Sequence, residues 1–246
     1  MSTREPAGSQ AVDRALALLA LFDDRRETLT IGEAAAALDV HRSTASRLLA
    51  ALVRGRLLTF DASRSGYVLS LGLLSLAGRA LTRYPVRSAA TDIVRELRDE
   101  TGETAWIGVP SESDVVFVDQ ASSREVQIGV DWVGRSQPLS AGVAGRLLLA
   151  FRTDLLAGLP AGAASVDAKE IQRTRRLGYL ARVLDPASEH AAVAVPIRDH
   201  RNEVVAAVAV SGPPQRVDSA RLRDELTPAT LRAGSRISER LGLPAV

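Results

Sequence analysis

The sequence predicts an α+β protein in two parts. Residues 1–70 are predicted to hold helices and one β-hairpin, residues 71–84 a linker helix, and residues 85–246 an antiparallel sheet flanked by helices. The first observation is that apolar residues recur at helical spacing through residues 10–54. The second is that short β-prone runs bounded by turn residues dominate the chain from residue 104 onward. A length of 246 residues suits one large or two modest domains.

The composition excludes several kinds of chemistry. No cysteine occurs, so disulfides, thiol nucleophiles and cysteine-ligated metal centres are impossible. No P-loop, GxGxxG, HExxH or GxSxG pattern is present, and His41, His190 and His200 are too scattered to form a metal site. We therefore expect no catalytic residue, cofactor or metal. No apolar run approaches the roughly 18 to 20 residues that cross a bilayer, so we expect a cytoplasmic protein without membrane contact.

Two helices open the chain. Residues 10–22 carry apolar side chains at helical spacing after Ser9, a plausible N-cap. The second helix is predicted over residues 31–38. Thr30 precedes it and Glu33 stands three positions later, which is the capping-box pattern at a helix start.

A third helix, residues 42–54, follows after a short turn. Asp39 stands where such turns usually have glycine, and aspartate tolerates the left-handed conformation better than most residues. Ala35 and Ala45 are small enough for the second and third helices to cross closely, and Val40 fills the space between them. The spacing therefore predicts a helix-turn-helix.

A β-hairpin completes this part. The β-prone residues 57–60 and 67–69 flank the turn-rich residues 61–66, so the helix-turn-helix is predicted to be winged. Arg64, near the hairpin tip, suits a contact with a DNA backbone or minor groove.

The positive charge is concentrated in the same region. Residues 40–66 contain five arginines and a single acid, Asp61, a local balance of +4, although the whole chain carries only +2. Arginines placed on phosphates release condensed counterions, so such a segment suits nucleic acid. An ordinary solvated helix face is the alternative. The predicted DNA-binding residues are the hydroxyl and arginine side chains of the third helix and the hairpin tip: Arg42, Ser43, Thr44, Ser46, Arg47 and Arg64. The unpaired backbone amides of Ser43 and Thr44, at the N-terminus of the third helix, would also favour phosphate.

The rest of the chain alternates helices and short strands. The apolar residues 71–81 form a linker helix that must pack on something and contributes to a dimer contact. Pro85 and Gly102 bound the next helix. The remaining strands are predicted at 104–109, 114–118, 125–130, 191–197 and 203–210, and the remaining helices at 141–151, 169–177 and about 218–241, the last packing on the sheet.

At this point the sequence resembles the IclR family of bacterial transcriptional regulators over nearly its whole length. The resemblance rests on four segments: TIGEAAAALDVHRSTASRLLAAL (residues 30–52), PLSAGVAGRLLLA (138–150), GYLARVLDPASEHAAVAVPIRD (178–199) and VVAAVAVSGP (204–213). Gly145 and Arg146 stand in place of the usual glycine-lysine pair. The signature also departs from the family at four positions: Arg182 replaces aspartate, Leu184 glutamate, Glu189 glycine and Ala192 cysteine.

The resemblance implies a GAF-like effector-binding and oligomerisation domain over residues 85–246. Carried over by position, the family's effector contacts fall on Val126, Ile128, Gly142, Val143, Ala144, Arg182, Ala192, Ala209 and Ser211. Most of these are apolar here, which suggests a larger or more hydrophobic effector, such as an aromatic or carboxylic acid. Trp106, Phe117 and Trp132 could line the pocket, although a lone aromatic in a strand is more often core.

The prediction is a homodimeric or homotetrameric regulator, by default a repressor, that binds a palindromic double-stranded DNA operator and responds to a small organic molecule. Activation is the alternative sign of control. A ligand-binding module or an enzyme without a DNA role is the alternative function.

Overall fold

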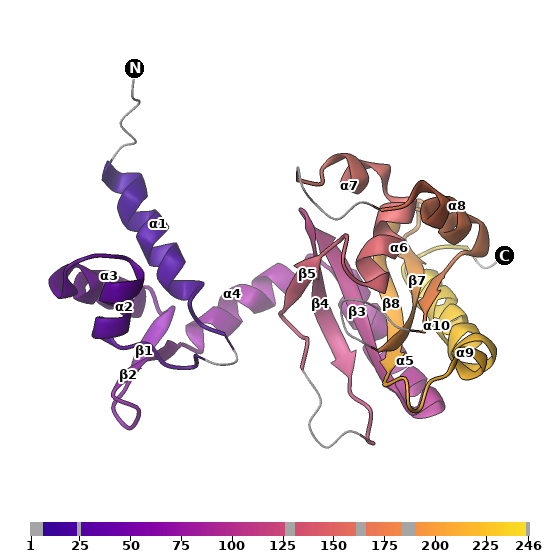
Figure 1. Cartoon of the computed structure of the whole chain (residues 1–246), viewed down its shortest axis with the longest axis horizontal. Helices are drawn as coiled ribbons and strands as arrows, with labels where there is room; N and C mark the ends of the chain where they lie inside the picture. The colour runs from indigo at the N-terminus through magenta and orange to yellow at the C-terminus, as the bar shows by residue number, and fades with distance from the viewer. Residues whose placement is uncertain (1–6, 24–25, 126–130, 161–165, 184–189, 245–246) are drawn as a thin grey trace. The chain divides into compact units, whose positions relative to one another are not determined.

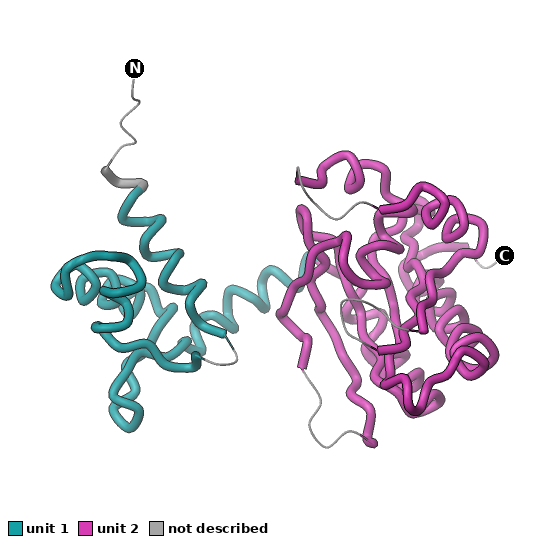
Figure 2. Tube along the Cα trace, in the orientation of Figure 1, with its two compact units in different colours: residues 1–83 teal, residues 84–246 magenta. Residues whose placement is uncertain are grey.

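The computed structural model describes residues 7–23, 26–125, 131–160, 166–183 and 190–244. The chain divides into two compact units, residues 1–83 and 84–246 (Figure 2). Each unit has its own hydrophobic core.

The N-terminal unit holds four helices and one hairpin among its described residues (Figure 1): α1 (Ala7–Leu19), α2 (Ile31–Ala37), α3 (Arg42–Arg54), β1 (Leu58–Asp61), β2 (Gly66–Leu69) and α4 (Gly72–Leu81). The prediction for the first helix was wrong at both ends, and Ser9 lies inside α1 rather than at its N-cap. Apolar residues at helical spacing indicate that a helix is present, but they do not mark where it begins or ends.

The start of α2 follows the capping box that the sequence predicts. Thr30 Oγ1 accepts a hydrogen bond from Glu33 N (3.2 Å), and Glu33 Oε2 accepts one from Thr30 N (2.8 Å). Asp39 adopts the left-handed φ of 49° in the turn between α2 and α3. Ala35 and Ala45 are buried in the core of this unit, so the prediction of a helix-turn-helix with small residues at the crossing is confirmed.

The hairpin is held by two sets of hydrogen bonds. At its tip, the Asp61 carboxylate accepts hydrogen bonds from Ser63 Oγ (2.6 Å) and Ser63 N (2.9 Å). In β2, one residue pair in from the turn, Tyr67 exchanges two backbone hydrogen bonds of 2.8 and 2.9 Å with Leu29, which tie the wing to the chain before α2. The wing is therefore fixed relative to the helices.

The C-terminal unit contains a six-stranded sheet in the order β5-β4-β3-β8-β7-β6, with every neighbouring pair antiparallel. The strands are β3 (Thr104–Ser111), β4 (Asp114–Ala121), β5 (Ser136–Pro138), β6 (Leu180–Arg182), β7 (Ala191–Arg198) and β8 (Val204–Gly212). The sequence pattern missed β5 and β6, because three residues are too few to show alternation. The strand predicted at 125–130 lies almost wholly outside the described residues.

Helices cover both faces of this sheet (Figure 1). On one face, α5 (Pro85–Thr101) and α10 (Thr227–Arg240) pack against each other and against the strands. On the other face, α6 (Val143–Phe151) packs on β7 and β8 and is flanked by α7 (Thr153–Ala157) and α8 (Ala168–Leu177).

The helix predicted over about 218–241 is interrupted. It begins as α9 (Ser219–Arg221), widens into a π-helical turn (Leu222–Leu226), and continues as α10. Pro228 has no N–H to donate to the carbonyl four residues earlier, so the backbone is re-paired here with a wider turn. The hydroxyl of Thr227 donates to the carbonyl of Leu222 (2.7 Å) at this point.

Glu103 is a buried carboxylate at the start of the sheet, with 1% of its side chain exposed. Arg216 donates to both of its oxygens (3.0 and 2.6 Å), and Arg221 Nη1 donates to Oε1 (3.0 Å). Arg221 Nη2 also donates to the carbonyl of Thr101 (2.7 Å). The hydrogen bonds to Glu103 raise the pKa of Arg216 above its ordinary value. This cluster ties the end of α5 to the segment between β8 and α9.

Candidate nucleic-acid interface and ligand site

The N-terminal end of α3 presents the predicted DNA-binding side chains. Arg42, Ser43 and Arg47 are exposed, whereas Thr44 and Ser46 are half-buried. His41 is the N-cap residue of α3 and accepts a hydrogen bond at Nδ1 from Ser43 N (3.3 Å). The expectation of free amides at Ser43 and Thr44 was therefore wrong, because His41 Nδ1 and the His41 carbonyl already accept from these two N–H groups.

The arginines of this surface differ in their pairing. Arg42 and Arg47 make no ion pair within the described part of the chain, so their charges are uncompensated there. Arg64 instead donates to Glu27 Oε2 (2.6 Å) and lies 3.7 Å from Asp61 Oδ2. Arg64 and Glu27 are exposed and Asp61 is half-buried, so the pairs of Arg64 contribute little energy and can exchange with a phosphate.

The predicted effector residues fall into three groups, of which the third, Arg182 and Ser211, lies beside the second. Val126 and Ile128 lie outside the described residues. A second group, Val143, Ala144, Ala192 and Ala209, meets in one buried cluster between α6 and the sheet, and Gly142 is the N-cap residue of α6 above it.

The part of the sheet that faces α6 carries small side chains next to one large one, Trp106. Ala194 stands opposite Ala209 across β7 and β8, and Trp106 stands opposite Ala209 across β3 and β8. The next row along places Arg182, Ala192 and Ser211 side by side on the same face.

Three aromatic rings extend this cluster. Trp106 and Phe117 meet edge to face with centroids 4.8 Å apart, and Trp132 lies 5.3 Å from Phe117. Trp106 is 7% exposed and Phe117 3%, so both are core residues as well as neighbours of the predicted ligand residues. Trp106 Nε1 donates a hydrogen bond to Ser211 Oγ (3.3 Å), a contact that the sequence did not reveal.

Arg182 belongs to a different environment. Its guanidinium pairs with Glu170 of α8, whose other oxygen accepts a hydrogen bond from Arg146 Nε of α6 (2.6 Å). This acid partner, twelve residues away in sequence, compensates the charge of Arg182.

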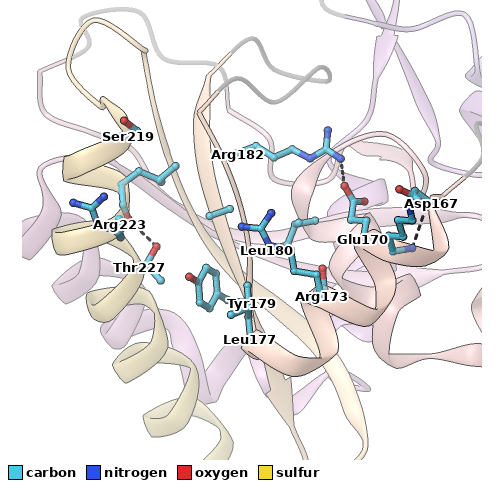
Figure 3. Close-up of a pocket in the computed structure, with 14 residues that line it drawn as sticks. Asp167, Glu170, Arg173, Leu177, Tyr179, Leu180, Arg182, Ser219, Arg223 and Thr227 are labelled. Atoms are coloured by element: carbon cyan, nitrogen blue, oxygen red, sulfur yellow. Dashed lines mark hydrogen bonds and ion pairs between the residues drawn. The ribbon is translucent and has the colours of Figure 1, made fainter.

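A groove of about 610 Å³ lies beside this ion pair, between α8 and the α9–α10 segment, with β6 between them (Figure 3). Tyr179, Arg173 and Arg223 line it together with Arg182. Of the seven predicted effector residues that the structure describes, Arg182 alone is in its lining.

Other kinds of site are not supported in the described residues. Their histidines, aspartates and glutamates form no group of three that could hold a metal ion. None of the helices that the structure describes is both long and apolar enough to span a membrane.

A winged helix-turn-helix unit followed by a helix-covered antiparallel sheet is the architecture of a DNA-binding transcription regulator. Residues 11–62 match the IclR helix-turn-helix domain, and residues 78–157 and 168–239 match the bacterial transcriptional regulator IclR C-terminal domain. These matches cover most of the sequence. The chain therefore belongs to the IclR family of transcriptional regulators.

Curated relatives and solved structures align with nearly the whole length of this chain. The HTH-type transcriptional regulator XynR of Escherichia coli is 28% identical, and the alignment covers 96% of this chain and 98% of XynR. The HTH-type transcriptional repressor AllR of Escherichia coli is 26% identical, covering 97% and 92%. Among solved structures, an IclR homologue from Microbacterium hydrocarbonoxydans complexed with 4-hydroxybenzoate superimposes with a TM-score of 0.75 at 23% identity, covering 94% of this chain and 98% of that one.

Proposed function

We propose that this protein is a ligand-controlled repressor that acts in the cytoplasm as a homodimer or homotetramer on a palindromic operator. The observation that carries the proposal is the N-terminal end of α3, where Arg42 and Arg47 are exposed and unpaired within the described residues. These side chains, with Ser43, Thr44 and Ser46, enter the major groove, and Arg64 of the wing contacts the backbone or the minor groove. The protein has no catalytic role in this proposal.

The proposed protein has three parts along the chain. Residues 1–70 form the DNA-binding domain, residues 71–84 the linker helix, and residues 85–246 the effector-binding and oligomerisation domain. The linker helix α4 supports dimer formation, because its N-cap residue Leu71 and its residues Leu74 and Leu76 are 80%, 66% and 55% exposed. Apolar side chains at this density on one short helix are stabilised by burial against a second copy.

The effector is proposed to bind between the N-terminus of α6 and the sheet. Gly142, Val143 and Ala144 lie at the N-terminal end of α6, whose positive dipole end suits a carboxylate, and the short side chains of Ala192 and Ala209 suit an apolar body beside them. Val126, Ile128, Arg182 and Ser211 complete the proposed contacts. An aromatic acid fits this chemistry, and 4-hydroxybenzoate, bound by the Microbacterium homologue, is the first compound to try.

DNA binding is tested by gel retardation with the DNA that flanks the protein's own gene, at two salt concentrations. We expect affinity that falls steeply with salt and is weakened by Arg47→Ala, while Arg95→Ala, a change in an exposed side chain of α5, leaves it unchanged. No salt-dependent binding by the wild type would favour a ligand-binding module or an enzyme.

Effector binding is tested separately, by thermal shift with a series of aromatic and aliphatic acids. We expect at least one acid to raise the melting temperature and to change DNA affinity. Ala209→Leu, which fills the proposed cavity, should abolish that response while DNA binding stays intact. A response that survives Ala209→Leu would place the effector elsewhere.

A further inference from the structure

A second concave surface lies in the N-terminal unit, between α1 and α3. It has a volume of about 540 Å³, and its floor is made of small and apolar residues, among them Ala11, Leu48 and Ala51. Three arginines stand around it: Arg14 from α1, and Arg47 and Arg54 from α3. We call this surface the α1–α3 groove.

The charge of the α1–α3 groove is uniformly positive. No acidic side chain lines it. Arg14, Arg47 and Arg54 make no ion pair and no side-chain hydrogen bond to any residue that the structure describes. The C-terminal unit behaves differently, since most of its described arginines have a carboxylate or carbonyl partner, as in the pairs Arg236–Glu96 and Arg240–Asp92. Three like charges gathered around one hollow attract an anion from outside the chain.

The spacing of the arginines suits a polyanion. Arg47 and Arg54 are seven residues apart, which is two turns of α-helix, so they share one side of α3 at about 10.5 Å along its axis. That distance equals the rise of about three nucleotides along one strand of B-DNA, at about 3.4 Å each. Arg14 faces them from α1 across the α1–α3 groove. A row of phosphates therefore matches the three guanidinium groups better than one small anion does.

The α1–α3 groove is also distinct from the apolar surface of α1. Val12 and Leu16 are 57% and 58% exposed. Each lies two positions from Arg14, and a step of two residues turns the helix by about 200°, so the apolar surface lies nearly opposite the arginine. A second copy of the chain can cover Val12 and Leu16 without filling the α1–α3 groove, and its own three arginines would be repelled there.

We propose that the α1–α3 groove binds the sugar-phosphate backbone of one DNA strand beside the major groove that α3 enters. Arg14 and Arg54 then belong to the DNA interface as phosphate-neutralising residues, together with Arg47. This proposal rests on the proposed function and adds residues outside the N-terminal turn of α3. Because these contacts are to phosphate, they strengthen binding to every sequence equally.

The test is the salt dependence of binding of the full-length protein to a short duplex of arbitrary sequence, between about 50 and 200 mM salt. We expect Arg14→Gln and Arg54→Gln each to reduce the slope of log K against log salt by about 0.9, and the double variant by about 1.8. The loss should be the same for the operator and for unrelated DNA. Arg95→Gln on α5 is the matched control and should leave the slope unchanged.

Three outcomes would overturn parts of this reasoning in different ways. If Arg47→Gln lowers the slope while Arg14→Gln and Arg54→Gln do not, the α1–α3 groove does not bind DNA although the protein does. If the wild type shows no salt-dependent binding, the proposed function itself fails. If Arg14→Gln changes the sedimentation of the protein and leaves the slope unchanged, the α1–α3 groove is a contact between chains. Circular dichroism of each variant verifies that it is folded.

Discussion

Replacing Glu103 with glutamine tests how the C-terminal unit is held together. The carboxylate accepts three charge-assisted hydrogen bonds, two from Arg216 and one from Arg221. Glutamine keeps one acceptor oxygen and directs an NH₂ group at arginine donors, so at least one of these bonds is lost and the remaining ones lose the negative charge of the acceptor.

The expected cost follows from the geometry. A hydrogen bond to a charged group contributes about 1.5–3 kcal/mol, and removing one partner of a fully buried ion pair costs about 3–5 kcal/mol. Arg216 and Arg221 are 31% and 27% exposed, so water recovers part of the loss. We expect Glu103→Gln to lower the free energy of unfolding by about 3 kcal/mol, and the melting temperature of a unit of this size by about 6–12 °C.

The sequence provides a reporter for this unit alone. The two tryptophans of the chain, Trp106 and Trp132, both lie in the unit of residues 84–246. Urea unfolding followed by tryptophan fluorescence therefore measures the C-terminal unit even if the N-terminal unit unfolds separately.

A neighbouring carboxylate serves as the control. Glu100 pairs with Arg232 on the surface, where the two side chains are 53% and 60% exposed. Glu100→Gln should change the free energy of unfolding by less than about 0.5 kcal/mol. Equal effects of Glu100→Gln and Glu103→Gln would refute the assignment of the buried cluster as a main support of this unit.

Three further predictions concern other features. Arg240 holds the pKa of Asp92 at about 2, below its ordinary 3.8, so their pair stabilises the unit above about pH 4 and is lost as the pH falls to about 2; Asp92→Asn should flatten the pH dependence of unfolding across that range. Gly145→Ala should destabilise the C-terminal unit by about 1–3 kcal/mol in urea unfolding, because its methyl group would lie 2.3 Å from the carbonyl oxygen of Leu139. A variant as stable as the wild type would show that the main chain at Leu139 can move away from the methyl group. Leu74→Glu should convert the proposed dimer to a monomer in sedimentation while leaving helix content unchanged, and a variant that is still dimeric would exclude α4 from the interface.

The N-terminal unit was largely predictable because its signals are local. The capping box of Thr30 and Glu33 acts over three residues, and the left-handed turn at Asp39 depends on a single backbone conformation. The hairpin follows from two β-prone runs and one turn. The N-cap role of His41 was missed, because histidine is not among the usual N-cap residues.

The C-terminal unit shows where such reasoning ends. The cluster around Glu103 joins residues 113 and 118 positions apart, and no sequence pattern marks partners at that distance. Glu170 of α8 accepts from Arg146 of α6 and from Arg182 of β6, a three-residue strand that shows no alternation in the sequence, so the sequence does not bring these three residues together. The predicted effector residues depend on family resemblance, and the structure adds that Val143, Ala144, Ala192 and Ala209 share one buried cluster.

The alanines that face α6 have an evolutionary consequence. Ala192, Ala194, Ala207 and Ala209 are all buried on this side of β7 and β8. At each of them a single nucleotide change, alanine to valine, adds two carbon atoms at a cost in stability of about 1–3 kcal/mol. With the effector bound where we propose, two copies of the gene can diverge in the metabolite they recognise through side-chain volume at these positions, while the DNA-binding surface stays as it was.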